Sequence, residues 1–138
     1  MAGFAASIVL DSSKDPAWGS YWRCLEDGRL TFQACQECGH KWLPVRSHCP
    51  SCLGKTWQWQ TASGDARLVS WVVYHRSYHP EVEADVPYAV GLVQLDEGPR
   101  LLARLFGPSN LEDFHVGQSL TLTINSRNGV SLPAFIPA

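Results

Sequence analysis

Two closely spaced cysteine pairs constrain the fold of this chain more than any other feature of its sequence. Cys35 and Cys38 form one Cys-x2-Cys pair, Cys49 and Cys52 form the second, and ten residues separate the pairs. Four thiolates at this spacing can surround one metal ion tetrahedrally. A site closed by four cysteines leaves no open coordination position. The pattern therefore predicts a structural metal site and places the function elsewhere in the chain.

Zn²⁺ is the expected ion, and three alternatives stay open. A redox site of the thioredoxin type would need one Cys-x2-Cys pair in a βαβ setting, which the sequence does not show. A disulfide pair and an iron-loaded, rubredoxin-like electron carrier are the others, and colour separates red ferric tetrathiolate from colourless zinc. Gly39 and Gly54, which follow the two pairs, are expected in the left-handed backbone region. Cys24 lies outside both pairs and is interpreted as a plain small side chain.

Composition narrows the class of protein. The chain has 138 residues, of which 45% are hydrophobic, and a net charge of −2. This charge argues against a general binder of nucleic acid or anionic membrane. No apolar run approaches the ~20 residues that a membrane span needs, and residues 1–10 lack a basic start. We therefore expect a cytoplasmic protein. Six Trp, four Tyr and five Phe are many for this length, so some should face a partner.

The first segment, residues 1–29, is expected to hold one amphipathic helix. Asp15 is a good N-cap, Pro16 suits the first helical position, and Gly28 can end the helix. One apolar stripe falls at the spacing i, i+3, i+4 and i+7, and it consists of Trp18, Tyr21, Trp22 and Leu25. This stripe packs on the chain's own core, or it forms a docking face or the wall of a ligand tunnel.

The second segment, residues 30–62, is predicted to be a zinc ribbon. Short strands are expected at 30–34, 41–43 and 56–60, entering and leaving the cysteine pairs. Strict alternation in the last of these places Trp57 and Trp59 on one face. Because so small a unit cannot fold on hydrophobic burial alone, the metal must supply much of its folding free energy.

The third segment, residues 63–138, shows the pattern of β structure throughout. Five strands are expected, and a short helix at 110–115 connects the third to the fourth. The strands are predicted at 67–75, 87–95, 100–106, 119–124 and 130–136. This order describes an OB-fold, a small Greek-key barrel. The fold class is therefore mainly β, with an N-terminal helix, a rubredoxin-like zinc ribbon and a five-stranded OB-fold barrel.

The loop at 75–86 is long for a hairpin connection, and long loops in compact domains are often functional. His75, His79, Glu81 and Asp85 suggest an acid–base cluster on it. The alternative, which we favour, is a solvated or partner-contacting loop.

The order of helix, four-cysteine ribbon and five-stranded barrel resembles the family called domain of unknown function thirty-five. These are zinc-ribbon OB-fold proteins associated with acyl-CoA chemistry. The residues that carry the resemblance are Gly28–Leu30, Cys35–Gly39, Cys49–Cys52, Ser63–Gly64, Pro87–Tyr88, Gly117 and Leu132–Phe135. No single motif is specific, because rubredoxin-like ribbons share the cysteines, but the combination and its order are.

The resemblance implies a companion enzyme. Members of this family typically accompany thiolase-like or lipid-transfer-type enzymes that act on acyl-CoA or related acyl substrates. The catalytic residues lie on that enzyme, so this chain is expected to be a non-catalytic accessory subunit with no catalytic residue of its own. It would stabilise the complex, with acyl-CoA at the shared interface. Trp18, Tyr21 and Trp22 are the expected contacts with the partner or the acyl/pantetheine channel. Claisen condensation, acyl transfer and retro-aldol cleavage all stay open.

Two rival functions follow from the same features. OB-folds and zinc ribbons also bind single-stranded nucleic acid, which requires a positively charged groove with aromatic side chains. Here eleven basic residues are scattered along the chain and thirteen acidic residues oppose them. The other rival is a free-standing hydrolase that uses His75 and His79.

Overall fold

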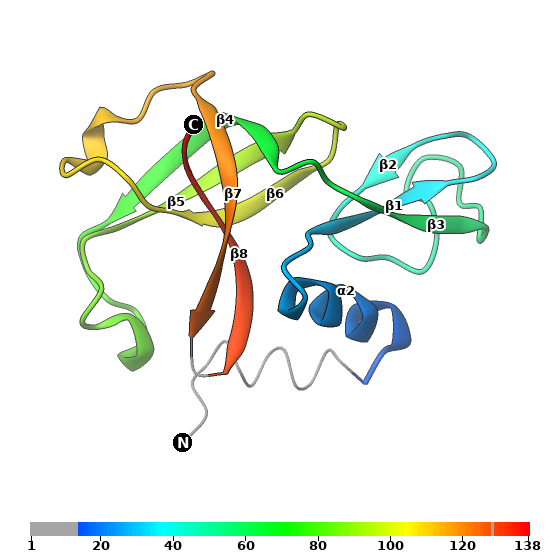
Figure 1. The fold of residues 1–138 in the computed structure, drawn as a ribbon, viewed down its shortest axis with the longest axis horizontal. Helices are drawn as coiled ribbons and strands as arrows, with labels where there is room; N and C mark the ends of the chain where they lie inside the picture. Colours follow the sequence, from blue (N-terminus) through cyan, green and yellow to red (C-terminus); the bar gives the residue numbers. More distant parts are fainter. Residues whose placement is uncertain (1–13, 128) are drawn as a thin grey trace.

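A computed structural model of the chain describes residues 14–127 and 129–138. A three-stranded sheet stands beside a closed five-stranded barrel, and the single α-helix of the described residues lies at their junction (Figure 1). Over the described residues, no helix combines the length and the hydrophobicity that crossing a bilayer requires.

Helix α2 spans Pro16–Glu26, as its capping residues predict. The Asp15 carboxylate accepts a hydrogen bond of 2.9 Å from the backbone N–H of Ala17, which satisfies one of the free donors at the helix start. Gly28 follows the helix with φ +84°, a left-handed conformation that glycine adopts without strain. The apolar stripe turns toward the rest of the molecule, with Tyr21 and Leu25 buried.

The small sheet has β1 (Thr31–Cys35) at its centre, with β2 (Lys41–Trp42) and β3 (Trp57–Thr61) antiparallel on either side. All three strands lie within one or two residues of their predicted positions. The Trp57 and Trp59 rings share a face, as alternation predicts, with their centroids 5.3 Å apart. Every residue of β1 is buried, because this strand packs on both of its faces.

The barrel follows the strand order β4-β5-β6-β8-β7 and closes by pairing β7 with β4. Its strands are β4 (Asp65–Tyr74), β5 (Tyr88–Leu95), β6 (Arg100–Leu105), β7 (Ser119–Arg127) and β8 (Val130–Pro137). Strands β6 and β8 pair in parallel and the other neighbours pair antiparallel. A single turn of 3-10 helix, η2 (Leu111–Asp113), replaces the predicted helix between β6 and β7, and Asn110 caps it. The five-stranded OB-fold is confirmed.

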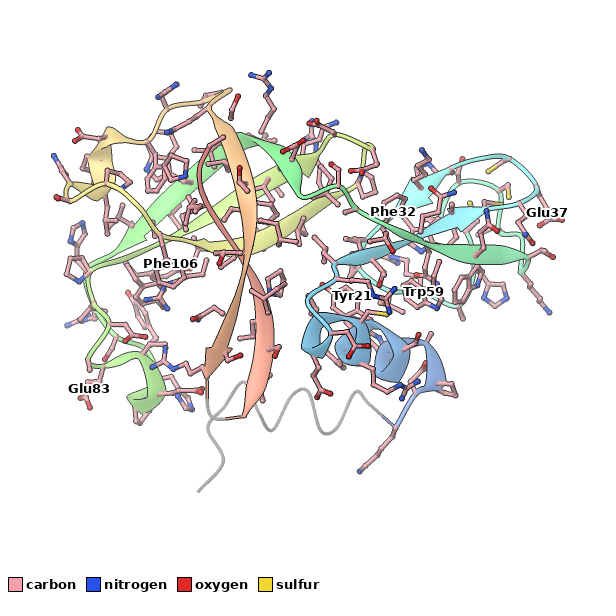
Figure 2. The ribbon with its side chains drawn as sticks, viewed as in Figure 1. Tyr21, Phe32, Glu37, Trp59, Glu83 and Phe106 are labelled. Carbon is pink, nitrogen blue, oxygen red and sulfur yellow. The ribbon has the colours of Figure 1, made fainter. Side chains whose placement is uncertain are left out.

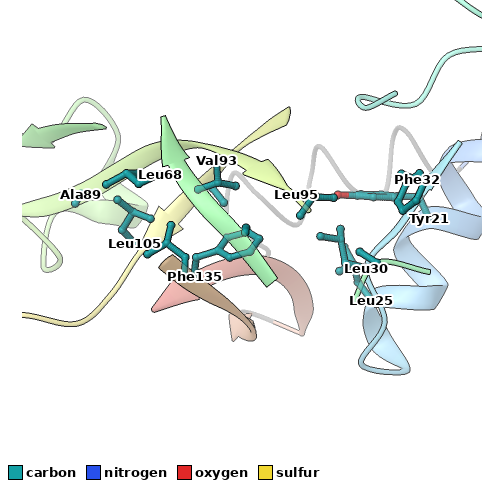
Figure 3. Packing of buried hydrophobic residues seen from close by; sticks show 14 of the residues in the cluster. Tyr21, Leu25, Leu30, Phe32, Leu68, Ala89, Val93, Leu95, Leu105 and Phe135 are labelled. Atoms are coloured by element: carbon teal, nitrogen blue, oxygen red, sulfur yellow. The ribbon is translucent and has the colours of Figure 1, made fainter. Parts of the chain in front are cut away.

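One hydrophobic core runs from inside the barrel to α2 and β1 (Figure 3). Val93 and Phe135 fill the barrel, Leu25 and Phe32 fill the other end, and Leu95 of β5 lies between the two groups. Each of these side chains is at most 1% exposed. A shared core fixes the orientation of α2 and the small sheet relative to the barrel, and this holds the walls of the cleft described below in place.

Candidate metal site and apolar cleft

The four paired cysteines converge on one point at the tip of the small sheet. The Sγ atoms of Cys35 and Cys52 are 3.6 Å apart, as are those of Cys38 and Cys49, and all four lie within 4.8 Å of one another. Tetrahedral Zn–S bonds of about 2.3 Å would place neighbouring sulfur atoms about 3.8 Å apart. The five cysteines of the chain are all free. The four sulfur atoms are therefore arranged to hold one metal ion, while Cys24 lies on α2.

The two cysteine loops repeat the same backbone hydrogen bonds. The Cys35 N–H donates to the His40 carbonyl at 2.8 Å, and the Cys49 N–H donates to the Gly54 carbonyl at 2.9 Å. Backbone N–H groups also point at the sulfur atoms, from Cys38 to Cys35 at 3.4 Å and from Ser51 to Cys49 at 3.4 Å. The hydrogen bond from Cys38 is the main cause that lowers the pKa of Cys35 to about 7. This favours the thiolate form of Cys35, whereas the pKa of Cys38 and that of Cys52 are raised beside the other thiols, so a bound cation would be needed to ionise all four.

The prediction that Gly54, in the second cysteine loop, adopts a left-handed backbone was wrong. Gly39 is left-handed as expected, with φ +80°, but in the second loop the left-handed residue is Leu53, with φ +64°. Gly54 instead lies against the exposed side chain of Glu37, the end of which can move aside for a Cβ. A Cβ at position 54 would lie 1.7 Å from Oε2 of Glu37 and 3.2 Å from the Cys52 sulfur. The two cysteine loops therefore pack against each other at Gly54.

An open cleft of about 670 Å³ lies between α2, the segment after β2 and the outer side of the barrel. This volume falls within the range of small-molecule sites. Most of its walls are apolar, and they include Trp18, Tyr21, Trp22, Leu43, Val45, Leu101, Leu132 and Pro133. The three aromatic residues that we expected at a partner or acyl channel thus line the same cleft.

The aromatic side chains of α2 divide between core and cleft. Tyr21 is 6% exposed and joins the shared core, and burial raises the pKa of its hydroxyl. Tyr21 and Trp59 both lie in the space between α2 and the small sheet (Figure 2). Trp18 and Trp22 are half-buried, and their rings stack with centroids 5.7 Å apart. This pair forms a preformed aromatic wall that still has exposed surface to offer a ligand or a partner.

The side of the cleft opposite α2 is held in place by the buried side-chain amide of Gln33, which the sequence analysis did not predict. Gln33, in the middle of β1, is fully buried. Its Nε2 donates to the Arg46 carbonyl at 2.7 Å, and its Oε1 accepts from the Arg46 N–H at 2.8 Å. Trp57 donates through Nε1 to the Ser47 carbonyl at 3.1 Å. These bonds pin the segment after β2, so that Leu43 and Val45 face the cleft. A glutamine inside an apolar strand was the available signal.

A cluster of charged side chains on the barrel was also not predicted from the sequence. It consists of Asp85, Arg104 and Arg127. Asp85 accepts hydrogen bonds from Arg127 and Arg104, the latter at 3.4 Å. Burial alone would raise the pKa of Asp85, but the two guanidinium groups outweigh it and hold the pKa below its usual value. The loop at 75–86 is thereby tied to β6 and β7.

Two of the four residues suggested as an acid–base cluster on this loop have structural contacts. His79 caps the short 3-10 helix η1 (Pro80–Val82) by accepting at Nδ1 from the Glu81 N–H at 3.0 Å. Asp85 is engaged by the two arginines. Across residues 14–127 and 129–138, the four cysteines form the one cluster of Cys, His, Asp or Glu side chains close enough to hold a metal.

Comparison with known proteins places this architecture in a family. The family model for the C-terminal OB-fold domain of ChsH2 matches residues 59–125. The solved structure of the Ltp2-ChsH2(DUF35) aldolase superposes with a TM-score of 0.77 at 30% identity, over 86% of this chain and 92% of that one. The chain belongs to the DUF35 family. Its recognition from sequence is confirmed.

Three curated relatives extend the comparison. A probable enoyl-CoA hydratase alpha subunit of Thermomonospora curvata is 34% identical over 80% of this chain and 34% of its own length. A DUF35 domain-containing scaffold protein of Pyrococcus furiosus is 36% identical over 62% of each. The benzoylsuccinyl-CoA thiolase subunit BbsA of Thauera aromatica is 28% identical over 79% of this chain and 77% of its own. The chain thus spans about a third of the first relative and less than two thirds of the second.

Proposed function

We propose that this DUF35 chain is a non-catalytic accessory subunit of a thiolase-like, lipid-transfer-type enzyme complex that acts on acyl-CoA or related acyl substrates. It stabilises the complex, and its cleft helps to line the channel for the acyl group or pantetheine arm. Catalysis belongs to the partner. The fold and its similarity to the Ltp2-ChsH2(DUF35) aldolase carry this proposal, because that likeness covers nearly the whole of both chains.

The cleft supports the same role. Trp18 and Trp22 offer half-exposed aromatic surface beside apolar walls, which suits both an acyl group and an interface. The names of relatives add an enoyl-CoA hydratase subunit, a thiolase subunit and scaffold proteins. Each of these is a part of an assembly or a scaffold for one.

We further propose that Cys35, Cys38, Cys49 and Cys52 hold one structural Zn²⁺. The sulfur spacing fits tetrahedral thiolate ligation, and four protein ligands close the site. Zinc here would hold the two cysteine loops together and supply folding free energy. Four reduced thiols also suit a reducing compartment, which favours the cytoplasm.

Co-expression tests the accessory role. The chain should co-purify with a thiolase-like protein encoded beside it, at a fixed ratio. The partner's turnover of an acyl-CoA should rise when the chain is present, whereas the chain alone should show no thiolase, aldolase or hydrolase turnover. Activity of the isolated chain that disappears in His75→Ala or His79→Ala would contradict the proposal. Salt-dependent binding to a single-stranded oligonucleotide, without complex formation, would favour the nucleic-acid alternative.

A further inference from the structure

The apolar cleft ends in charged side chains that the proposed function leaves unexplained. Arg100, Arg104 and Arg127 line it together with Glu81. A smaller cavity of about 190 Å³ shares Arg104 and Arg127 with the cleft and extends to Asp85. The charged residues around the two cavities are three guanidinium groups and two carboxylates. One positive charge is therefore in excess, even with Glu81 counted as ionised.

Arg127 and Asp85 satisfy each other. Arg127 donates to the Asp85 carboxylate through Nη1 and to the Glu81 carbonyl through Nη2. Both terminal nitrogens of this guanidinium are engaged by the loop, so Arg127 fixes the loop.

Arg104 is held differently, by aromatic rings more than by hydrogen bonds. Its guanidinium carbon lies 4.2 Å from the centroid of the Tyr88 ring and 5.3 Å from that of Phe106. Its contact with Asp85 is long, at 3.4 Å, and its buried Nε has no hydrogen-bond partner. A guanidinium has five N–H donors, so Arg104 is oriented and charged but largely unsatisfied. Arg104 and Arg127 share the single Asp85 carboxylate, so this end of the cleft keeps an excess positive charge that Arg104 can present to a ligand.

We propose that Arg104 binds a carboxylate at the end of an acyl group that lies in the cleft. This inference rests on the proposed function in taking the cleft to be an acyl site. The apolar walls suit the hydrocarbon part, and the planar guanidinium suits a carboxylate. A carboxylate also matches the single excess charge, whereas a phosphate monoester carries close to two. The substrate class is thus an acyl thioester with a second, free carboxyl group.

Calorimetric titration of the full metal-loaded chain with two N-acetylcysteamine thioesters tests this. The octanoyl thioester is neutral, and the suberoyl monothioester has the same chain length with a terminal carboxylate. Neither contains phosphate. The suberoyl thioester should bind at least about tenfold more tightly than the octanoyl thioester, a difference typical of a charge-assisted contact. Equal affinities, or no binding of either, would overturn the inference.

Two variants separate the contribution of Arg104 from that of general positive charge. Arg104→Gln should bind both thioesters equally. Arg67→Gln is the control and should keep the preference, because Arg67 is exposed on β4, lines neither cavity and donates through Nη1 to the Gly117 carbonyl at 3.2 Å. Equal loss in both variants would contradict a specific site. Tighter, Arg104-dependent binding of 4′-phosphopantetheine than of the suberoyl thioester would identify the anion as a phosphate and overturn the carboxylate assignment.

A third variant covers the case in which Arg104→Gln fails to fold. Arg104→Lys keeps a positive charge but loses the planar fork, so its preference should be reduced without being abolished. An unchanged preference would contradict recognition by the guanidinium. Co-purification of the same variants with the enzyme partner is measured separately. Arg104→Gln should still form the complex. Loss of co-purification would therefore count against the accessory role, whereas loss of the thioester preference alone reports on the carboxylate site.

Discussion

At the scale of single residues, the paired cysteines and Cys24 should respond oppositely to the same substitution. Elemental analysis of the wild-type chain should find close to one zinc per chain. Cys35→Ser should lose the metal and destabilise the small sheet, since structural zinc supplies much of the folding free energy of such units. Cys24→Ser should leave the metal content unchanged, because its sulfur lies on α2 and contacts Arg29 at 3.6 Å. A metal-free chain that still unfolds cooperatively would contradict the site.

The two left-handed residues of the cysteine loops make a second pair of predictions. Leu53 has φ +64° and is 73% exposed, so its side chain gains little from packing and its backbone is strained. Leu53→Gly should raise the free energy of unfolding by about 0.5–1 kcal/mol. Gly39→Ala, at φ +80° with open space around it, should lower that free energy by about 1 kcal/mol. Chemical denaturation measures both, and a destabilised Leu53→Gly would argue against strain at this position.

Asp85 should make stability depend on pH in the acid range. Its pKa is lower in the folded chain than in the unfolded chain, so its ion pairs stabilise the fold above the ordinary Asp pKa of about 4. This contribution is lost as the pH falls through the lowered folded pKa. Asp85→Asn should therefore cost about 1–2 kcal/mol at neutral pH, between the values for surface and buried pairs, and nearly nothing at strongly acid pH. Glu83→Gln, on the same exposed loop, is the control and should change stability little.

At the scale of elements, helix α2 should separate folding from assembly. Leu25 is fully buried, so Leu25→Ala should lower the free energy of unfolding by about 2–5 kcal/mol. Trp22 is half-buried and lines the cleft, so Trp22→Ala should cost less stability but weaken the complex with the proposed partner, as exposed Trp at interfaces often does. Arg23→Ala, on the exposed side of α2, is the control. If Leu25→Ala and Trp22→Ala lose equal stability and assembly is unaffected, α2 only packs on the chain's own core and does not contact the partner.

The elements themselves were largely predictable because each has a local cause. Asp15, Pro16 and Gly28 mark the ends of α2, and alternation marks the barrel strands, as in the sequence of β7. The convergence of four cysteines also follows from spacing, because each Cys-x2-Cys pair is a local turn. These features depend on neighbours within a few residues.

What the sequence did not reveal depends on partners far apart in the chain. Arg104 and Arg127 follow Asp85 by 19 and 42 residues in the sequence. The three side chains come together only because the barrel closes. The Gln33 amide meets the Arg46 backbone across the ribbon, and Gly54 faces Glu37 of the other cysteine loop. Such contacts leave no local pattern in the sequence. This is why Gly54 was wrongly predicted to be left-handed, and why the charged end of the cleft was not predicted.

At the scale of the whole molecule, the shared core bears on how the chain unfolds. The sequence divides the ribbon from the barrel near residues 62 and 63, which would favour two separate units. Leu95 of β5, however, is 1% exposed and lies between the barrel core and the cluster of Tyr21, Leu25 and Phe32 (Figure 3). Truncating Leu95 would leave a cavity that borders both the barrel core and the cluster at α2, so it should destabilise both.

We therefore predict that the metal-loaded chain unfolds in one calorimetric transition. Leu95→Ala should lower the free energy of unfolding by about 2–5 kcal/mol, keep a single transition and release the metal at a lower denaturant concentration than the wild type. Leu102→Ala on β6, 71% exposed, is the control and should change stability by less than about 0.5 kcal/mol. Two resolved transitions in the wild type, or metal release unaffected by Leu95→Ala, would show that ribbon and barrel fold independently. The cleft between them would then be assembled only when the proposed partner binds.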